Sequence, residues 1–441
     1  MSGRSLLLRA FAAAAGCAAV LVCQNALAQD VPTPTSAALI VDQTPAPAAQ
    51  AEPADAAPRT DVWDLFRKLR KKTGASEAAP ADQPAAEKPG VTFALVPLVS
   101  SKPSTGLAVG IGGSISFSLG DRAGTRASTV PMGLMVSVRR QVSLNATPDI
   151  YSPGNVWILR GDNHYQRSGL DMYGLGVATQ SDTRTNVEFE SVKFMETVYR
   201  RVAPSVYAGL GVQFRQIIGA SPSTDTEALW EQSPFVTYSR EHGLDPSRQT
   251  AAGTSASVAF DNRDSAVEAR RGWFAGATYR TFFKGFLGGD TNWQELYLDV
   301  RAYTSLTKDG RHVLAFWGYG DFVTSGIAPY LSLPGTASDA AGRSGRGYAE
   351  GHFRGERLVY GEVEYRAVLT ANGLLSAVGY LNATTVSNDA AHEQVFDAVA
   401  LGGGAGLRVL LDKHSRTNLA IDVGIGRRGN HGLYIAIQET F

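Results

Sequence analysis

The chain has 441 residues, and its 41 Lys and Arg are balanced by 41 Asp and Glu. This balance excludes the basic excess expected of a nucleic-acid-binding protein and also an extended acidic tail. Glycine is frequent at 47 residues, which fits a strand-rich protein with many turns better than a helical one.

The first 28 residues have the pattern of a cleaved export signal. Two arginines precede an apolar stretch from Ala10 to Cys23, and Ala26 and Ala28 supply the small residues of a cleavage site. We therefore expect a signal peptide over 1–28. An uncleaved anchor or a lipoprotein fits less well, because the apolar run is short and Leu-Val precedes the second cysteine. Both cysteines lie in this segment, so the mature protein is expected to contain none.

Residues 29–90 are rich in Ala, Pro, Gln and acidic residues. Such a segment cannot bury a core, and we expect a disordered linker on the periplasmic side. Residues 60–72 interrupt it with an amphipathic pattern, in which Trp63, Phe66 and Leu69 share one side. This predicts a short helix that contacts the inner membrane face or plugs a barrel. A partly ordered piece of linker is an equally good interpretation.

From residue 91 onward the hydrophobic period is two. In 206–214, 295–303 and 418–426, an apolar row alternates with a row of Gly, Tyr and isolated charges. A soluble half-buried sheet also alternates, but its polar row would be rich in Lys, Glu and Thr. A row of Gly, Tyr and single charges is typical of a barrel lumen. No stretch after the signal approaches the ~20 apolar residues of a membrane-spanning helix.

The turn pattern predicts an all-β fold, a transmembrane antiparallel β-barrel over 91–441 with about sixteen strands. Short connections at 202–203, 308–310, 370–372 and 412–415 alternate with long ones at 218–251, 324–355 and 386–399. With both termini in the periplasm, the long connections face outward. The candidate strands lie near 91–98, 105–119, 130–140, 142–150, 155–165, 187–201, 204–217, 252–261, 272–285, 293–307, 311–323, 356–369, 373–385, 400–411, 416–427 and 431–441.

The last candidate strand has the pattern of a barrel-closing strand. Its apolar row contains Leu433, Ile435, Ile437 and Phe441, and Glu439 departs from the row. Aromatic residues are expected to form girdles at the two membrane interfaces. The candidates for these girdles are Trp273, Tyr279, Trp293, Trp317, Tyr365 and Phe441.

Three groups of residues resemble a known family. The first is 260–265 with 271–274, the second is 345–348 with 351–357 and 362–366, and the third runs from 406 to the C-terminal Phe. Together they resemble the barrel domain of the BamA/TamA-type outer-membrane assembly and translocation superfamily, also called the bacterial surface antigen family. The likeness covers roughly 91–441 and is strongest after 255.

In that family, the sixth outside loop folds back into a sixteen-stranded barrel and carries an Arg-Gly-aromatic tip. Arg346, Gly347 and Tyr348 lie between the eleventh and twelfth candidate strands, which is the place of that sixth loop. The resemblance therefore implies that these three residues form the tip of a loop held inside the lumen.

A guanidinium inside a lumen must be paired, and carboxylates of the barrel wall can bind it bidentately. Glu362 and Glu364 lie on the inward row of the following strand and are the expected partners of Arg346. The family usually has an aspartate on the next strand as a second partner. The nearest counterpart here is Asn382, and this departure is expected to weaken the contact.

Asp261, Arg263 and Asp264 are expected to brace an inside turn with charge pairs.

The seven histidines are scattered singly, so we expect no metal site. The glycine run 402–406 opens a predicted strand, which favours close strand packing over a phosphate loop. No Gly-x-Ser-x-Gly elbow occurs. We expect no catalytic residue, no cofactor and no enzyme activity.

Family members carry periplasmic polypeptide-transport-associated domains, and residues 29–90 show no pattern for one. The resemblance implies insertion or translocation of a polypeptide or lipid client through a weak seam between the first and last strands. A passive or gated channel and a structural or surface-binding barrel are the alternatives. Outer-membrane lipid and a polypeptide client are the expected partners of a monomeric barrel. A loop 324–355 inside the lumen would argue against free diffusion.

Overall fold

The computed structural model describes residues 60–62, 64, 91–102, 106–121, 124–126, 128–178, 184–265, 268–339, 342–412, 416–437, 439 and 441. All of them belong to one compact unit, Ala46–Phe441. The expected signal peptide 1–28, most of the expected linker 29–90 and residues 63 and 65–72 of the expected helix lie outside the described residues.

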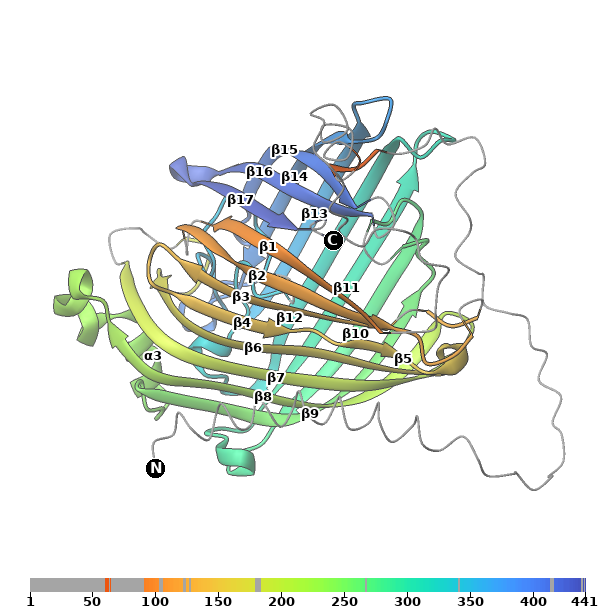
Figure 1. The fold of residues 1–441 in the computed structure, drawn as a ribbon. Coiled ribbons are helices and arrows are strands. Elements are labelled where there is room, and N and C mark those ends of the chain that lie inside the picture. Colours follow the sequence, from red (N-terminus) through yellow and green to blue (C-terminus); the bar gives the residue numbers. More distant parts are fainter. Residues whose placement is uncertain are drawn as a thin grey trace, which may run out of the picture. The chain divides into compact units, whose positions relative to one another are not determined.

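The strands of the described residues form one antiparallel sheet that closes on itself (Figure 1). Both β4 and β5 pair with β3 on one side and β6 on the other, so they are two parts of one barrel strand. The wall therefore has sixteen strands, and the predicted fold is confirmed. The strands are β1 (Thr92–Lys102), β2 (Gly106–Phe117), β3 (Ser128–Ser137), β4 (Val142–Ala146), β5 (Asp149–Tyr151), β6 (Trp157–Met172), β7 (Thr185–Ala203), β8 (Val206–Pro222), β9 (Arg248–Asp261), β10 (Gly272–Phe282), β11 (Trp293–Ser305), β12 (His312–Gly326), β13 (Arg357–Val368), β14 (Leu375–Val386), β15 (Ala400–Asp412), β16 (Thr417–Gly426) and β17 (His431–Ile437).

Long connections gather at one end of the barrel, which we call the outer end. They are 223–247, 327–356 and 387–399, whereas connections at the opposite, inner end include 204–205, 306–311 and 369–374. The short helices are η1 (Pro153–Asn155), η3 (Thr224–Gln232), α3 (Pro234–Glu241), η4 (Phe286–Gly288), η5 (Tyr330–Ser332), η6 (Asp389–Ala391) and η7 (Arg427–Gly429). Within the described residues, no helix is long and apolar enough to cross a membrane.

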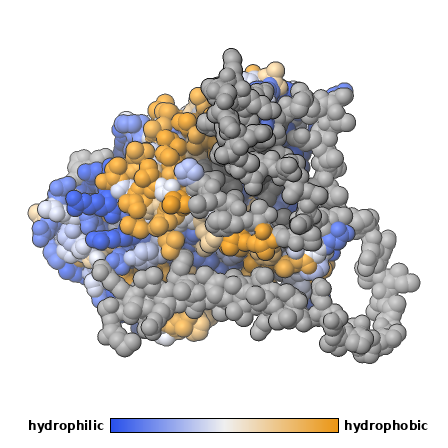
Figure 2. Space-filling view, viewed as in Figure 1, coloured by the Kyte–Doolittle hydropathy of each residue, from blue (hydrophilic) through white to orange (hydrophobic). Residues whose placement is uncertain are grey.

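The two faces of the wall differ as the alternation predicts. The outward row is apolar and exposed, as at Ile111, Leu210 and Leu381, and an apolar area covers part of the face seen in Figure 2. The inward row carries buried charges such as Glu295 and Arg408. Burying charge inside and apolar surface outside is the arrangement that a lipid surround favours.

An apolar cluster lies under α3 at the outer end. Ser233 caps α3 by accepting a hydrogen bond from the Val236 N–H, and Pro234 occupies the first turn, which explains why the helix begins there. Phe235 and Val236 of α3 join the cluster with side chains of the strand ends and of η5. Leu170 and Met172 also pack into it, which is why β6 runs beyond its predicted end at 165.

The predicted closing strand is too long. β17 ends at Ile437, whereas Glu439 and Phe441 are buried inside the barrel. The Phe441 ring lies 5.3 Å from that of Trp317. The expected outward position of Phe441 is therefore wrong. The reason is Glu439, which follows the end of β17. Its buried carboxylate accepts a hydrogen bond from the Arg408 guanidinium at 2.8 Å and so directs the end of the chain into the lumen.

The predicted girdles are only partly right. Trp273, Tyr279 and Tyr365 are exposed on the outward row. Trp317 faces inward, where its indole N–H donates to Asp299 at 3.1 Å, and Trp293 is buried in the cluster under α3. Both tryptophans have packing partners that the sequence pattern alone does not reveal.

The start of the predicted helix 60–72 is described. Asp61 and Asp64 cap it reciprocally, because each carboxylate accepts a hydrogen bond from the other residue's backbone N–H, at 2.9 and 3.3 Å. The Thr60 N–H donates to the Asn372 carbonyl at 2.8 Å. Asn372 belongs to the inner turn 369–374, so the chain at residue 60 lies at the inner end.

Candidate functional site

The tip of the connection 327–356 lies inside the barrel. Arg346 is buried, and its Nη2 is 2.5 Å from both Glu362 Oε1 and Glu364 Oε2. Its Nη1 is 2.7 Å from Asp422 Oδ2. The guanidinium carbon also lies 3.5 Å from the centre of the Tyr380 ring. The predicted pairing of Arg346 with Glu362 and Glu364 is thus present, and the loop does enter the lumen.

Asn382 has a different position from the one expected. Its Nδ2 donates to the backbone carbonyl of Arg346 at 3.0 Å and does not contact the guanidinium. The third carboxylate comes from Asp422 on β16. β16 thus supplies a carboxylate where β14 has an amide, and the expected weakening of the contact stays a prediction.

Glycines of β15 and β16 form the floor under the tip. A Cβ added at Gly424 would lie 2.7 Å from the Gly347 nitrogen, and one at Gly426 would lie 2.6 Å from the Tyr348 ring. Gly347 itself has a φ of 113°, which an L side chain rarely adopts. The glycine run 402–406 belongs to the same floor, since a Cβ at Gly402 would meet the Arg346 carbonyl at 3.0 Å. Close approach of a backbone explains these glycines.

Tyrosines fix the backbone of the tip. The Gly347 N–H donates to Tyr434 Oη, and Tyr434 Oη donates to the Tyr348 carbonyl, both at 2.9 Å. Tyr348 Oη donates to the Leu401 carbonyl at 2.5 Å and accepts from the Arg427 N–H at 2.9 Å. The tip is therefore held by β15, β17 and the outer turn between β16 and β17.

The ion pairs extend beyond Arg346 into a buried network. Arg408 contacts Asp422 at 2.5 Å and Glu439 at 2.8 Å, and Arg366 contacts Glu364 at 2.7 Å. Buried charges are tolerated only when paired, and here ion pairs join three arginines and four acids among the described residues. The members are Arg346, Arg366, Arg408, Glu362, Glu364, Asp422 and Glu439, and Arg343 adds a hydrogen bond to the Glu439 carbonyl.

Sequence reasoning missed three members of this network, Asp422, Arg408 and Glu439. A signal was available, because Asp422 is the one charge on the inward row of 418–426 and Arg408 follows the glycine run. Which strand reaches the tip depends on barrel curvature and loop path, and alternation along a single strand does not encode either.

The outer part of the loop has its own anchor. Arg354 donates to the Leu333 carbonyl at 2.7 Å, and the Gly176 N–H donates to the Arg354 carbonyl at 2.8 Å. His352 lies beside Tyr173, with ring centroids 4.3 Å apart. Burial, reinforced by the charge of Arg428, lowers the pKa of His352 to about 4. His352 is therefore neutral at pH 7.

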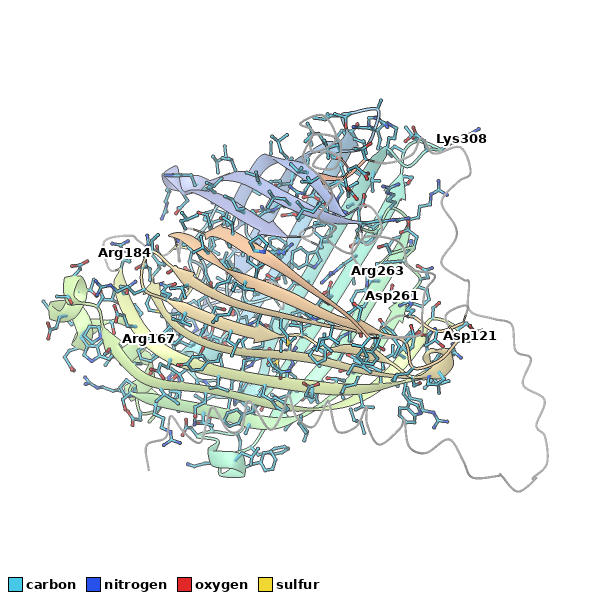
Figure 3. All side chains as sticks on the ribbon, in the orientation of Figure 1. Asp121, Arg167, Arg184, Asp261, Arg263 and Lys308 are labelled. Carbon is cyan, nitrogen blue, oxygen red and sulfur yellow. The ribbon has the colours of Figure 1, made fainter. Side chains whose placement is uncertain are left out.

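The predicted inner turn is braced by charge. Arg263 donates to Asp261 through Nε at 2.9 Å and through Nη2 at 3.0 Å, and Figure 3 shows the two residues together. Arg126, from the turn between β2 and β3, lies 3.9 Å from Asp261. Arg416, from the turn between β15 and β16, lies 3.9 Å from Asp264. Three inner turns therefore meet at 261–264.

The seam between the first and last strands is narrow. Among the described residues, β1 and β17 share one pair, Ser101 with Ile435. By comparison, β16 and β17 share seven pairs and β1 and β2 share eleven. Ile435 and Ile437 of the closing strand also pair with β16.

Among the residues that the structure describes, no group of three or more His, Cys, Asp or Glu could hold a metal ion.

Known proteins with this architecture were found by structure and by family. The barrel resembles BamA from Haemophilus ducreyi lacking POTRA domains 1–3, with TM-score 0.51, 14% identity and coverage of 80% of this chain and 70% of that one. It resembles CdiB from Escherichia coli (TM-score 0.52, 13% identity, 82% and 66% covered) and CdiB from Acinetobacter baumannii (0.50, 11%, 79% and 59%). These likenesses support the fold alone, and the chain spans less than two thirds of each CdiB chain. No curated protein matches the sequence.

The family model is more specific than the structural likeness. An Omp85 superfamily domain matches residues 114–426, which is more than half of the chain and contains both the loop tip and most of its seat. The resemblance inferred from the sequence motifs is confirmed by this match. The chain therefore belongs to the Omp85 superfamily of outer-membrane β-barrel proteins.

Proposed function

We propose that this barrel inserts or translocates a polypeptide client at the outer membrane, with the β1–β17 seam as the client's site and the loop tip as a lid on the lumen. The observation that carries the proposal is the seam, in which the part of the chain that the structure describes forms the single pair Ser101 and Ile435. Membership of the Omp85 superfamily supports it.

The chemistry of such a seam selects an extended polypeptide. Most of β1 pairs with β2 on one side and, within the described residues, has no residue partner in β17 on the other. Backbone N–H and C=O groups at a lipid-exposed edge are unfavourable unless they are hydrogen-bonded. A client strand that adds to this edge would satisfy them and would be recognised through its backbone.

The lumen disfavours the alternative of an open channel. The tip occupies the space between β13, β15 and β16, and the cluster under α3 covers part of the outer end. A structural barrel that binds partners through its outer connections is the second alternative. It makes no use of the narrow seam, so an experiment at the seam separates it from the main proposal.

The position of the N-terminal segment belongs to the same proposal. We place the tail in the periplasm and residues 1–28 in a cleaved signal peptide. The contact of Thr60 with Asn372 at the inner end supports this orientation. Mass spectrometry of the mature N-terminus tests the cleavage, and a protease added to intact cells should leave the tail uncut.

Photo-crosslinking in cells tests the client site. A probe at Ile435 lies in the seam, and a matched probe at Val258 lies on the outward row of β9. Polypeptides captured at Ile435 and absent at Val258 would support the proposal and identify the client. Equal capture at the two positions, or lipid alone at both, would contradict it.

A disulfide across the seam tests whether the seam must open for the client to be captured. Ser101→Cys with Ile435→Cys joins β1 to β17, because directly paired residues have Cα atoms about 5 Å apart. Val423→Cys with Leu433→Cys makes the same bond between β16 and β17 and leaves the seam free. Only the seam disulfide should abolish client capture, and reduction should restore it.

A further inference from the structure

The connection between β10 and β11 ends in an exposed apolar tip. Phe283, Phe286 and Leu287 have exposed fractions of 41%, 45% and 66%. The rings of Phe283 and Phe286 meet edge to face, with centroids 6.3 Å apart. We call these three side chains the hairpin knob. Single exposed apolar residues are ordinary, but a contiguous patch marks an interaction surface.

The backbone of the knob holds these side chains outward. Leu287 has a φ of 47°, a left-handed conformation that is unfavourable for leucine. The Gly285 N–H donates to the Gly289 carbonyl at 2.7 Å, and the Gly289 N–H donates to the Phe286 carbonyl at 2.9 Å. This strained turn is closed by hydrogen bonds and still exposes its apolar side chains. Such an arrangement indicates that the exposed side chains form an interaction surface.

The position of the hairpin knob along the barrel axis indicates which surroundings its side chains contact. β10 runs for 11 residues and ends at Phe282, and a tilted strand crosses a membrane in about 9–11 residues. Phe283 therefore lies where the outer interface begins, on the same outward row as Tyr279. Figure 1 shows the tip of this connection standing clear of the wall, and apolar atoms appear at the same lower edge in Figure 2.

We infer that the hairpin knob inserts into the interface of the outer leaflet, with Phe286 and Leu287 among the first acyl carbons. Continuity with the lipid-facing row of β10 selects lipid as the occupant over a protein partner. Lys284 is exposed between the two phenylalanines, where its ammonium can reach lipid phosphate. Aromatic residues and lysine together are the usual composition of such an interface.

Fluorescence quenching of a labelled Leu287→Cys variant tests the inference. The labelled protein is placed in vesicles of phosphatidylethanolamine and phosphatidylglycerol, and its fluorophore is quenched either by headgroup-labelled lipid or by aqueous iodide. Leu229→Cys is the matched control, because Leu229 is 41% exposed but lies in η3 of the outer connection 223–247. Leu210→Cys, on the outward row of β8, is the control within the membrane.

We expect the label at Leu287 to be quenched by the lipid and to lose most of the iodide quenching seen at Leu229. Iodide quenching equal to that at Leu229 would overturn the inference. Protection from both quenchers would also overturn it, because it would point to a protein partner. Phe286→Cys gives a second position if the first variant folds poorly, and the unsubstituted chain, whose cysteines are Cys17 and Cys23, gives the labelling background.

Discussion

Removing the charge of Arg346 should release the loop tip from the lumen. In Arg346→Met, Glu362 loses its arginine, whereas Glu364 and Asp422 each keep another one. The Glu362 carboxylate is then buried without its ion-pair partner. Breaking a buried ion pair from one side costs about 3–5 kcal/mol. With about 1.4 kcal/mol per tenfold change, the ratio of docked to released tip should fall by roughly 100-fold to 4,000-fold.

A charge-balanced variant separates this electrostatic reason from a general packing defect. Glu362→Gln removes the acid whose arginine is lost, so Arg346→Met with Glu362→Gln removes one charge of each sign and keeps the net charge of the network. The double variant should recover most of the docking, because the two changes share one contact and do not add. Arg346→Lys should be intermediate, since an ammonium cannot reproduce the planar fork of a guanidinium.

Labelling of a cysteine in the loop measures the docking. Ser344 is 4% exposed, so a Ser344→Cys probe should react with a membrane-impermeant maleimide on intact cells only when the tip is released. Phe396→Cys, on an exposed outer connection, reports the amount of protein at the surface. Unchanged Ser344 labelling in Arg346→Met, or labelling of the double variant as fast as that of the single one, would show that the charge of Arg346 does not hold the tip.

Three further predictions follow from other contacts. His352 has a pKa of about 4 in the docked loop against 6.5 when free, so the docked state binds fewer protons between those values. Docking should therefore weaken by roughly 3 kcal/mol as the pH falls through this window, and Ser344 labelling in a His352→Phe background should lose its pH dependence. Asp261→Ala frees two arginines at the inner turns and should raise single-channel conductance in planar bilayers, whereas an unchanged conductance would show that these turns do not narrow the inner mouth. Glu196 is hydrogen-bonded to Asn163 at 2.7 Å on the outward row, and replacing both residues with Val should stabilise the barrel by about 1–3 kcal/mol, which heat-dependent gel mobility would detect as a higher unfolding temperature.

Alternation along the sequence was sufficient to predict the wall, because the period of two is a local property of each strand. The positions of Glu362 and Glu364 followed for the same reason, since both lie on one row directly after the loop. The position of this loop as the sixth outer connection followed from counting the turns between the predicted strands. These features need no knowledge of how the barrel curves.

The remaining features depend on contacts between distant strands. Asp422 lies 76 residues from Arg346, and only the path of the loop across the lumen brings them together. Asn382 was assigned from its place in a motif, and its amide binds the tip backbone instead. Phe441 was placed by extending an alternation that Glu439 ends. In each case a long-range polar contact determined the position that the local pattern left open.

The same network connects the tip with the seam. Asp422 contacts Arg346 of the loop and also Arg408, and Arg408 contacts Glu439, which follows the closing strand β17. Because Arg408 is paired with both Asp422 and Glu439, moving Glu439 out of the lumen would remove one of the carboxylates that compensate the buried Arg408 charge. A client that displaces β17 from β1 would therefore also weaken the ion pairs that hold the lid. The opening of the seam and the release of the tip are thus expected to be coupled through Arg408, and Arg408→Met with Glu439→Gln should uncouple them while leaving the contacts of Arg346 intact.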